Sequence, residues 1–163
     1  MLSLALEPEV AAIAAQHQSE VSGTPPERYM VVDIGGGTVD ITVHDKSTGR
    51  ISVLLPPMGN TWGGTTINEA LSMLLEEAVD DGGFQSFIES DPIRAIATLN
   101  KLFFEEFEER KKRFGNEIEG YNLLEEKIFK STVDKIIECV RAAFDELTDH
   151  IDTVYLVGGF GGC

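Results

Sequence analysis

Two aspartates flank three consecutive glycines in the segment Asp33-Ile-Gly-Gly-Gly-Thr-Val-Asp40. Glycines have no side chain, so backbone N–H groups can approach an anion closely there and the chain can adopt positive φ. Carboxylates cannot hold phosphate themselves, but Asp33 and Asp40 can order a hydrated Mg²⁺ that bridges phosphate oxygens. Thr38 can bond a terminal phosphate or its attacking water. The segment predicts a site for a magnesium-bound polyphosphate, with a plain glycine-rich hairpin as the alternative.

Two further segments contain residue types at spacings that suit nucleotide binding. The segment Leu156-Val-Gly-Gly-Phe-Gly-Gly162 reads as a strand that delivers paired glycines at its end, a shelf for a flat ring or a ribose. A glycine-rich tail is the alternative. Glu109, Lys112 and Arg113 are three and four residues apart, so they share one face of a helix. For this cluster the alternative is a solvated charge pair.

The elements that must position these segments follow from hydrophobic periodicity and turn residues. Alternation predicts a strand over 38–44 with Val39, Ile41 and Val43 on one face. Because the glycines join two strands instead of opening a helix, Rossmann and Walker loops do not fit. Turns between the first three strands favour three antiparallel strands in an α/β layer fold. The remaining predicted elements are strands over 29–34, 50–55 and 153–157, and helices over 4–16, 65–79, 92–114 and 123–147.

Composition limits the class of protein. A chain of 163 residues, 42% of them hydrophobic, fits one domain with an ordinary core. The net charge of −15 argues against nucleic acid or anionic membranes as partners. No apolar run reaches the about 20 residues needed to span a membrane, and the N-terminus does not read as a secretion signal. Two cysteines are too few for a disulfide framework, so we expect a reduced, cytoplasmic location.

The two glycine segments, in this order, resemble the phosphate-2 and adenosine motifs of the actin/sugar-kinase/heat-shock ATPase superfamily. Three more segments are similar to its chaperone branch, the heat shock 70 kDa protein family. The segment from Leu6-Glu7-Pro8-Glu9 to Ala14 resembles a connecting helix, Gly59-Asn-Thr-Trp-Gly-Gly64 a glycine loop, and Glu109-Arg-Lys-Lys-Arg113 an adenosine clamp. The details Glu-Pro-Glu, Gly-Gly-Gly-Thr-Val-Asp, Lys-Arg-Phe-Gly and Leu-Val-Gly-Gly-Phe look most like the divergent heat shock 70 kDa protein 12A/12B-like subfamily.

The resemblance implies a fold and a division of the chain. The fold is the second lobe of an actin-like (ribonuclease H-like) ATPase domain: three antiparallel strands, a further strand and flanking helices. Residues 1–28 correspond to the connecting helix and loop, and 29–81 with 123–163 to the lower subdomain. Residues 82–122 correspond to the upper, adenosine-clamp subdomain, which we expect to be reduced to helices because little sequence separates Gly115 from Leu123.

The resemblance also implies roles for individual residues around Mg²⁺ and ATP or ADP. Catalysis would involve Glu7, Asp33 and Thr38, and the metal would be held by Asp33 and, through water, by Asp40. The nucleotide-binding set would be Gly35, Gly36, Gly37 and Thr38 at the phosphates, Gly63 and Gly64 by backbone, Glu109, Lys112, Arg113 and Asn116 around the adenosine, and Gly158, Gly159 and Phe160 as the opposite shelf. Client proteins or co-chaperones would bind through regions that this chain lacks.

Some positions depart from the chaperone pattern. Thr65 and Asn68 stand where that branch has acidic residues, and Phe160 replaces a small hydroxyl residue. The resemblance implies that ATP binds between two lobes of an intact, stress-linked chaperone ATPase. Nothing in this chain resembles the first phosphate loop or the lysine of the first lobe. We therefore expect no productive hydrolysis by this chain alone. A non-hydrolysing interaction module and a sugar-kinase-type phosphotransferase are the alternatives.

Overall fold

The computed structural model describes Val10 and residues 26–79, 82–113 and 123–160. Most of the helix expected over 4–16 therefore lies outside the described residues, although Val10 itself is helical. The described chain forms two compact units. The first combines residues 26–64 with 133–160, and the second comprises 65–79, 82–113 and 123–132.

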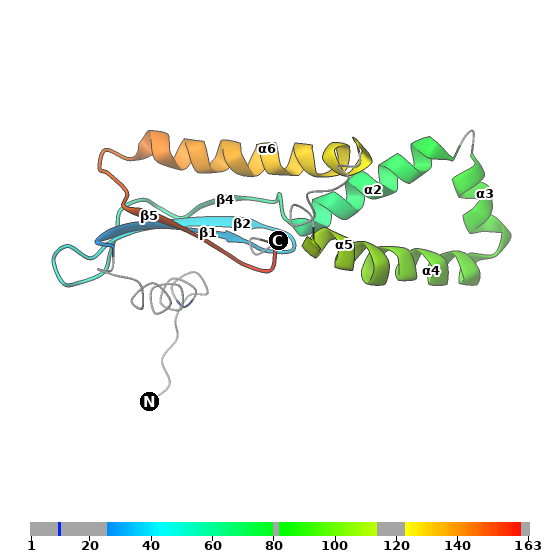
Figure 1. Cartoon of the computed structure of the whole chain (residues 1–163), viewed down its shortest axis with the longest axis horizontal. Helices are drawn as coiled ribbons and strands as arrows, with labels where there is room; N and C mark the ends of the chain where they lie inside the picture. The colour runs from blue at the N-terminus through cyan, green and yellow to red at the C-terminus, as the bar shows by residue number, and fades with distance from the viewer. Residues whose placement is uncertain (1–9, 11–25, 80–81, 114–122, 161–163) are drawn as a thin grey trace, which may run out of the picture. The chain divides into compact units, whose positions relative to one another are not determined.

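The first unit is built on a mixed five-stranded sheet in the order β3-β2-β1-β5, with β4 also paired to β2 (Figure 1). β1 lies antiparallel to β2 and parallel to β5, so the first and last strands of the described residues are neighbours. This confirms a mixed α/β fold. The strands are β1 (Arg28–Ile34), β2 (Val39–Asp45), β3 (Ser52–Val53), β4 (Met58–Asn60) and β5 (Thr153–Val157).

The expected third strand over 50–55 is largely wrong. Only Ser52–Val53 pairs there, and Met58–Asn60, expected as a loop, forms a second short strand on the same edge of β2. Pro56 and Pro57 lie between the two pieces. Because proline has no N–H to donate, it interrupts the ladder, and the edge of β2 is shared by two strands instead of one.

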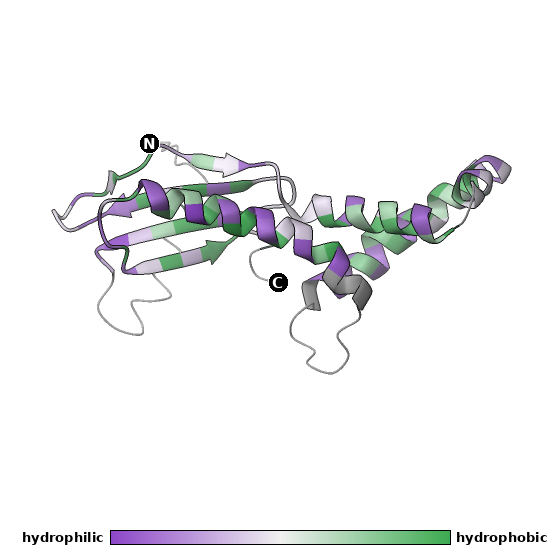
Figure 2. Ribbon diagram, turned by 90° about the horizontal axis from the view of Figure 1, so that it is seen from above, coloured by the Kyte–Doolittle hydropathy of each residue, from purple (hydrophilic) through white to green (hydrophobic). Residues whose placement is uncertain are grey.

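The core of this unit lies between one sheet face and α6 (Leu123–Glu146), whose part from Val133 onward belongs here. Figure 2 shows α6 crossing that face. The predicted alternation of β2 is confirmed, because its valines and isoleucine are all buried. The core residues are Met30, Val32, Ile34, Val39, Ile41, Val43, Ile136 and Ala143, with Trp62, Cys139 and Phe160 among those packed around them.

The opposite sheet face carries a smaller cluster around Tyr29 and Val31, which contact Tyr155 and Val157. The Tyr29 ring stacks on His44 with 5.1 Å between ring centroids, and His44 is buried. β1 has buried side chains on both faces of the sheet, as a strand between two neighbours, β2 and β5, does.

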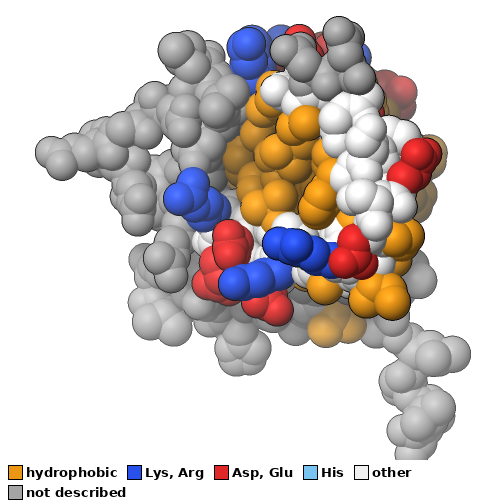
Figure 3. All heavy atoms as spheres, turned by 90° about the vertical axis from the view of Figure 1, so that its right-hand side faces the viewer, with side chains coloured by type: hydrophobic (Ala, Val, Ile, Leu, Met, Phe, Trp, Pro, Cys, Tyr) orange, Lys and Arg blue, Asp and Glu red, His pale blue; other side chains and the backbone are white. Residues whose placement is uncertain are grey.

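The second unit is helical in its described residues. Its elements are α2 (Gly64–Ala78) from Thr65 onward, α3 (Gly83–Ser90), α4 (Pro92–Asn100), η1 (Lys101–Phe107), α5 (Glu108–Arg113) and the first part of α6. Asp91 caps α4 as its sequence suggests, since its Oδ1 accepts a hydrogen bond from the Arg94 N–H at 3.1 Å. Figure 3 shows a face of this unit on which hydrophobic side chains gather beside charged ones.

Two features of the second unit differ from expectation. The single helix over 92–114 contains a π-helical segment, η1, between α4 and α5. Helix α3 is not among the helices predicted from the sequence, because Gly82 and Gly83 favour an end to the preceding helix. Gly82 adopts the left-handed conformation with φ 84°, which turns the chain directly into α3. No helix among the described residues has the length and apolarity needed to cross a membrane.

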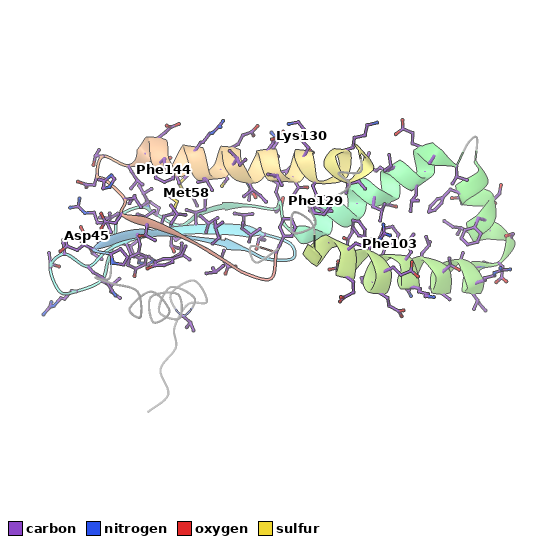
Figure 4. All side chains as sticks on the ribbon, in the orientation of Figure 1. Asp45, Met58, Phe103, Phe129, Lys130 and Phe144 are labelled. Carbon is purple, nitrogen blue, oxygen red and sulfur yellow. The ribbon has the colours of Figure 1, made fainter. Side chains whose placement is uncertain are left out.

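The beginning of β1 is tied to the end of β2 by one carboxylate, Asp45, labelled in Figure 4. Its Oδ2 accepts from the Arg28 Nε–H at 2.9 Å, and its Oδ1 accepts from the Ser47 N–H at 2.7 Å. Hydrogen bonds from the Ser47 hydroxyl and backbone, followed by the one from Arg28, lower the pKa of Asp45 from 3.8 to about 2. The folded state therefore favours the ionised carboxylate.

We predict that Asp45→Asn lowers the free energy of unfolding at neutral pH. A carboxyl with a lowered pKa in the folded state stabilises fully above its unfolded pKa and loses that effect as the pH falls toward about 2. Urea denaturation of both proteins should thus show a gap that closes between pH 4 and pH 2. Asp149→Asn, which removes a more exposed partner of Arg28 at 3.4 Å, is the control and should show little change. A pH-independent gap would contradict the role given to Asp45.

Candidate functional site

The triple-glycine segment forms the turn of the β1–β2 hairpin. The Gly35 N–H donates to the Thr38 carbonyl oxygen at 2.9 Å. Asp33 and Asp40 are register partners on the two strands, so the two carboxylates leave the sheet side by side, next to the turn. Gly36, Gly37 and Thr38 are exposed. The turn therefore presents an open stretch of backbone beside two carboxylates.

A second glycine segment packs directly on this turn. The Gly64 N–H donates to the Gly35 carbonyl oxygen at 3.1 Å. A Cβ added to Gly63 would lie 2.6 Å from the carbonyl oxygen of Gly36 and 2.7 Å from the carbonyl carbons of Gly36 and Gly37. Any side chain at position 63 would push the turn out of place, so the contact requires glycine.

The third glycine segment reaches the same place from the end of β5. The Phe160 N–H donates to the Ile34 carbonyl oxygen at 3.0 Å. A Cβ on Gly158 would lie 2.4 Å from both the Ile34 carbonyl oxygen and Oδ1 of Asp33, and Gly158 has φ +91°. Gly159 has open space around it. The structure thus brings the glycines near 35, 63 and 158 into one cluster around the start of the turn.

The polar groups of this cluster are connected. The Thr38 hydroxyl donates to Oδ2 of Asp40 at 3.0 Å. Gly59 in β4 lies beside the same carboxylate, because a Cβ there would be 3.2 Å from Asp40 Oδ1. Gly59 was quoted as part of a motif but given no role by sequence reasoning. Strand β4, which places Gly59 beside Asp40, was not predicted because a glycine-rich segment is typical of a loop.

The aromatic residue of the shelf has a structural role. Its side chain packs against the hydrophobic core of the first unit, together with Trp62, while its backbone N–H holds Ile34. Phe160 therefore anchors the segment that carries Gly158 and Gly159. Trp62 also packs against this core.

The roles of the other site residues expected from the sequence stay predictions. Glu7 and Asn116 lie outside the described residues. Glu109, Lys112 and Arg113 lie in α5, where Glu109 is exposed. Their role around adenosine stays a prediction.

Sequence reasoning missed a polar network within the second unit that joins α2 to α5. Lys111 is 6% exposed, and its Nζ donates to Asn68 Oδ1 at 3.1 Å and forms an ion pair with Glu108. The Asn68 Nδ2–H donates to Glu108 Oε1 at 3.2 Å. The signal was present in the i,i+3 spacing of Glu108 and Lys111. Most neighbouring residues are also charged, so the sequence does not indicate which of these side chains point inward.

The donor set can be compared with what a cation needs. Among the described residues there is no group of three histidine, cysteine, aspartate or glutamate side chains placed to hold a metal by themselves. Mg²⁺ in nucleotide sites is held by one or two carboxylates, with phosphate oxygens and water as the other ligands. The pair Asp33 and Asp40 fits that pattern, in which metal and polyphosphate bind together.

We predict that Gly158→Ala lowers the free energy of unfolding by about 2 kcal/mol or more, because the new Cβ overlaps backbone and the residue must keep a positive φ. Gly159→Ala is the matched control. With open space around it, the free energy should change by about 1 kcal/mol or less. Equal effects in urea denaturation would contradict the close approach.

We also predict that Lys111→Met lowers the free energy of unfolding by about 1–3 kcal/mol, because Glu108 and Asn68 lose a buried partner. Methionine keeps the apolar stem of the side chain, so the loss reports the ammonium. Glu109→Gln, one residue after Glu108 and exposed, should change the same quantity by about 0.5 kcal/mol or less. Thermal and urea denaturation of both variants measure the difference.

Comparison with known proteins shows similarity to one kind of chaperone. No protein-family model matches the chain. The chain is similar to chaperone protein HscA homologues of Acinetobacter baylyi (29% identity), Aliivibrio fischeri (28%) and Rickettsia typhi (29%), in each case over 98% of this chain. It spans about a quarter of their length, 25–26%. The chain is thus similar to chaperones of the heat shock 70 kDa family, and the finer 12A/12B-like assignment is not supported.

Proposed function

We propose that this chain is part of an actin-like, chaperone-type nucleotide-binding domain, and that its triple-glycine turn binds the phosphate end of Mg·ATP or Mg·ADP. One observation carries the proposal: three glycine segments that are far apart in the sequence meet around one turn, beside two carboxylates in register. The similarity to HscA homologues supports a chaperone-like nucleotide-binding domain, whichever subfamily the chain belongs to.

The charge of the chain dictates how such a site would work. At −15, the long-range field repels a polyphosphate, so the attraction must come from short-range donors and a cation. The exposed backbone of Gly36, Gly37 and Thr38 provides N–H groups, and Asp33 and Asp40 provide oxygen ligands for the cation. Mg²⁺, when bound, neutralises phosphate charge and orients the terminal phosphate.

The surrounding residues would complete the nucleotide site. Gly159, in open space after the anchored Gly158, would form the shelf for the ribose or base. Glu109, Lys112 and Arg113 of α5 are proposed to contact the adenosine from the family resemblance alone. Thr38, whose hydroxyl is held by Asp40, would orient the attacking water with Asp33. Hydrolysis requires a second lobe to enclose that water, so we expect binding without turnover from this chain. In the longer protein, lobe closure would be coupled to client or co-chaperone binding.

The experiment is a calorimetric titration of the 163-residue chain with ATP and with inorganic tripolyphosphate, each with and without Mg²⁺. We expect magnesium-dependent binding of both ligands, weakened about tenfold or more by Asp33→Asn with an unchanged melting temperature. Asp149→Asn is the matched control, because it removes an exposed carboxylate beside Arg28, far along the strand from the turn. Absence of heat for both ligands from folded protein would favour the non-hydrolysing interaction module instead.

A further inference from the structure

The helical stretch from Pro92 to Arg113 contains one wider turn. Helices α4 and α5 lie end to end (Figure 1), and the π-helical segment η1 joins them. A π-helix bonds residue i to i+5 instead of i+4, so its turn holds about one residue more than an α-turn. Lys101 and Glu106 are five residues apart and form an ion pair at 3.7 Å. Neighbours on an α-helix are three or four residues apart, so this pair fits the wider turn.

The buried side chains before η1 follow the α-helical repeat. Ala95 is fully buried, and Leu99 and Leu102 are half-buried. Their spacings of four and three residues put them on one face of the helix, its buried face. If the same repeat continued, the next residues on that face would be Glu106 and Glu109. Both are exposed, so the repeat does not continue unchanged.

The buried side chains after η1 come one residue late. Phe107 and Lys111 are 8% and 6% exposed, and they follow Leu99 by eight and twelve residues. Whole α-helical turns from Leu99 end after about seven and about eleven residues. The wider turn of η1 takes up the difference of one residue. It therefore rotates α5 relative to the repeat of α4 and keeps one buried face along the whole stretch.

The rotation decides which charges of this stretch turn inward. With it, Lys111 reaches Asn68 of α2, whose Oδ1 accepts from Nζ at 3.1 Å, and forms an ion pair with Glu108. Without it, Glu106 and Glu109 would be turned inward instead. Two carboxylates of like charge would then be removed from water, a cost that the paired Lys111 avoids. The network thus offsets the cost of the wider turn.

We propose that η1 is a conformational device that sets the rotation of α5, with one extra residue held in the helix by the network of Lys111, Glu108 and Asn68. The device fixes the face of α5 that is presented to solvent, on which Glu109 lies. Because the extra residue is accommodated within η1, its removal leaves α4 and the buried face of α5 where they are. The proposal concerns the rotation of one helix in the second unit and does not depend on nucleotide binding.

The first test removes one residue from η1. Deletion of Glu105, which is exposed, should turn the stretch into a continuous α-helix with Lys111 still buried. We expect the melting temperature of the 163-residue chain to rise, or to fall by about 3 °C or less. The matched control is deletion of Glu138, exposed in α6 between the core residues Ile136 and Ala143, where no wider turn absorbs the loss. It should lower the melting temperature by about 10 °C or more.

The second test asks whether Lys111 keeps its partners in the shortened helix. Lys111→Met should lower the melting temperature by the same amount, about 3 °C or more, in the full chain and in the chain without Glu105. Glu109→Gln, at an exposed position of the same helix, is the control and should have little effect in either background. Circular dichroism verifies the helical content of each variant.

Three results would overturn the proposal. A deletion of Glu105 that lowers the melting temperature as much as deletion of Glu138 would mean that η1 holds no extra residue. An effect of Lys111→Met that disappears in the shortened chain would mean that the deletion rotates α5. No effect of Lys111→Met in the full chain would mean that the network does not hold the rotation.

Discussion

The close approach of Gly63 and Gly158 to the backbone of the β1–β2 turn is the constraint on which the candidate site depends. A single methyl group at either position would overlap carbonyl atoms of Ile34 or Gly36. The two glycines come from segments nearly a hundred residues apart, and the pairing of β5 with β1 and of β4 with β2 brings both to the turn. The hydrogen bonds from Gly64 and Phe160 then hold the turn from two sides. This leaves Gly36 and Gly37 open to a ligand.

Local sequence patterns were enough to predict much of this arrangement. The alternation of β2 and the two glycine segments depend on residues close to one another, and each could be predicted without knowing the fold. What could not be read depends on distant or competing interactions. The two prolines split the edge strand, the glycines before α3 masked its beginning, and the inward turn of Lys111 depends on Asn68, a residue on another helix. No single-sequence pattern contains that pairing.

Electrostatics gives the site its proposed chemistry. An acidic chain can bind a polyphosphate only where backbone donors and a cation outweigh the repulsion, and the paired Asp33 and Asp40 sit where such a cation would be needed. The similarity to HscA homologues covers nearly all of the chain but about a quarter of theirs. The glycine cluster is therefore proposed as one side of a nucleotide site.

The most direct measurement is the perturbation of backbone amide signals by nuclear magnetic resonance, as inorganic tripolyphosphate is added with and without Mg²⁺. We expect magnesium-dependent shifts concentrated at Gly36, Gly37 and Thr38, with smaller shifts at Gly63, Gly64 and Gly159. Shifts spread over lysine and arginine side chains elsewhere, or no shift at the turn at saturating ligand, would contradict it.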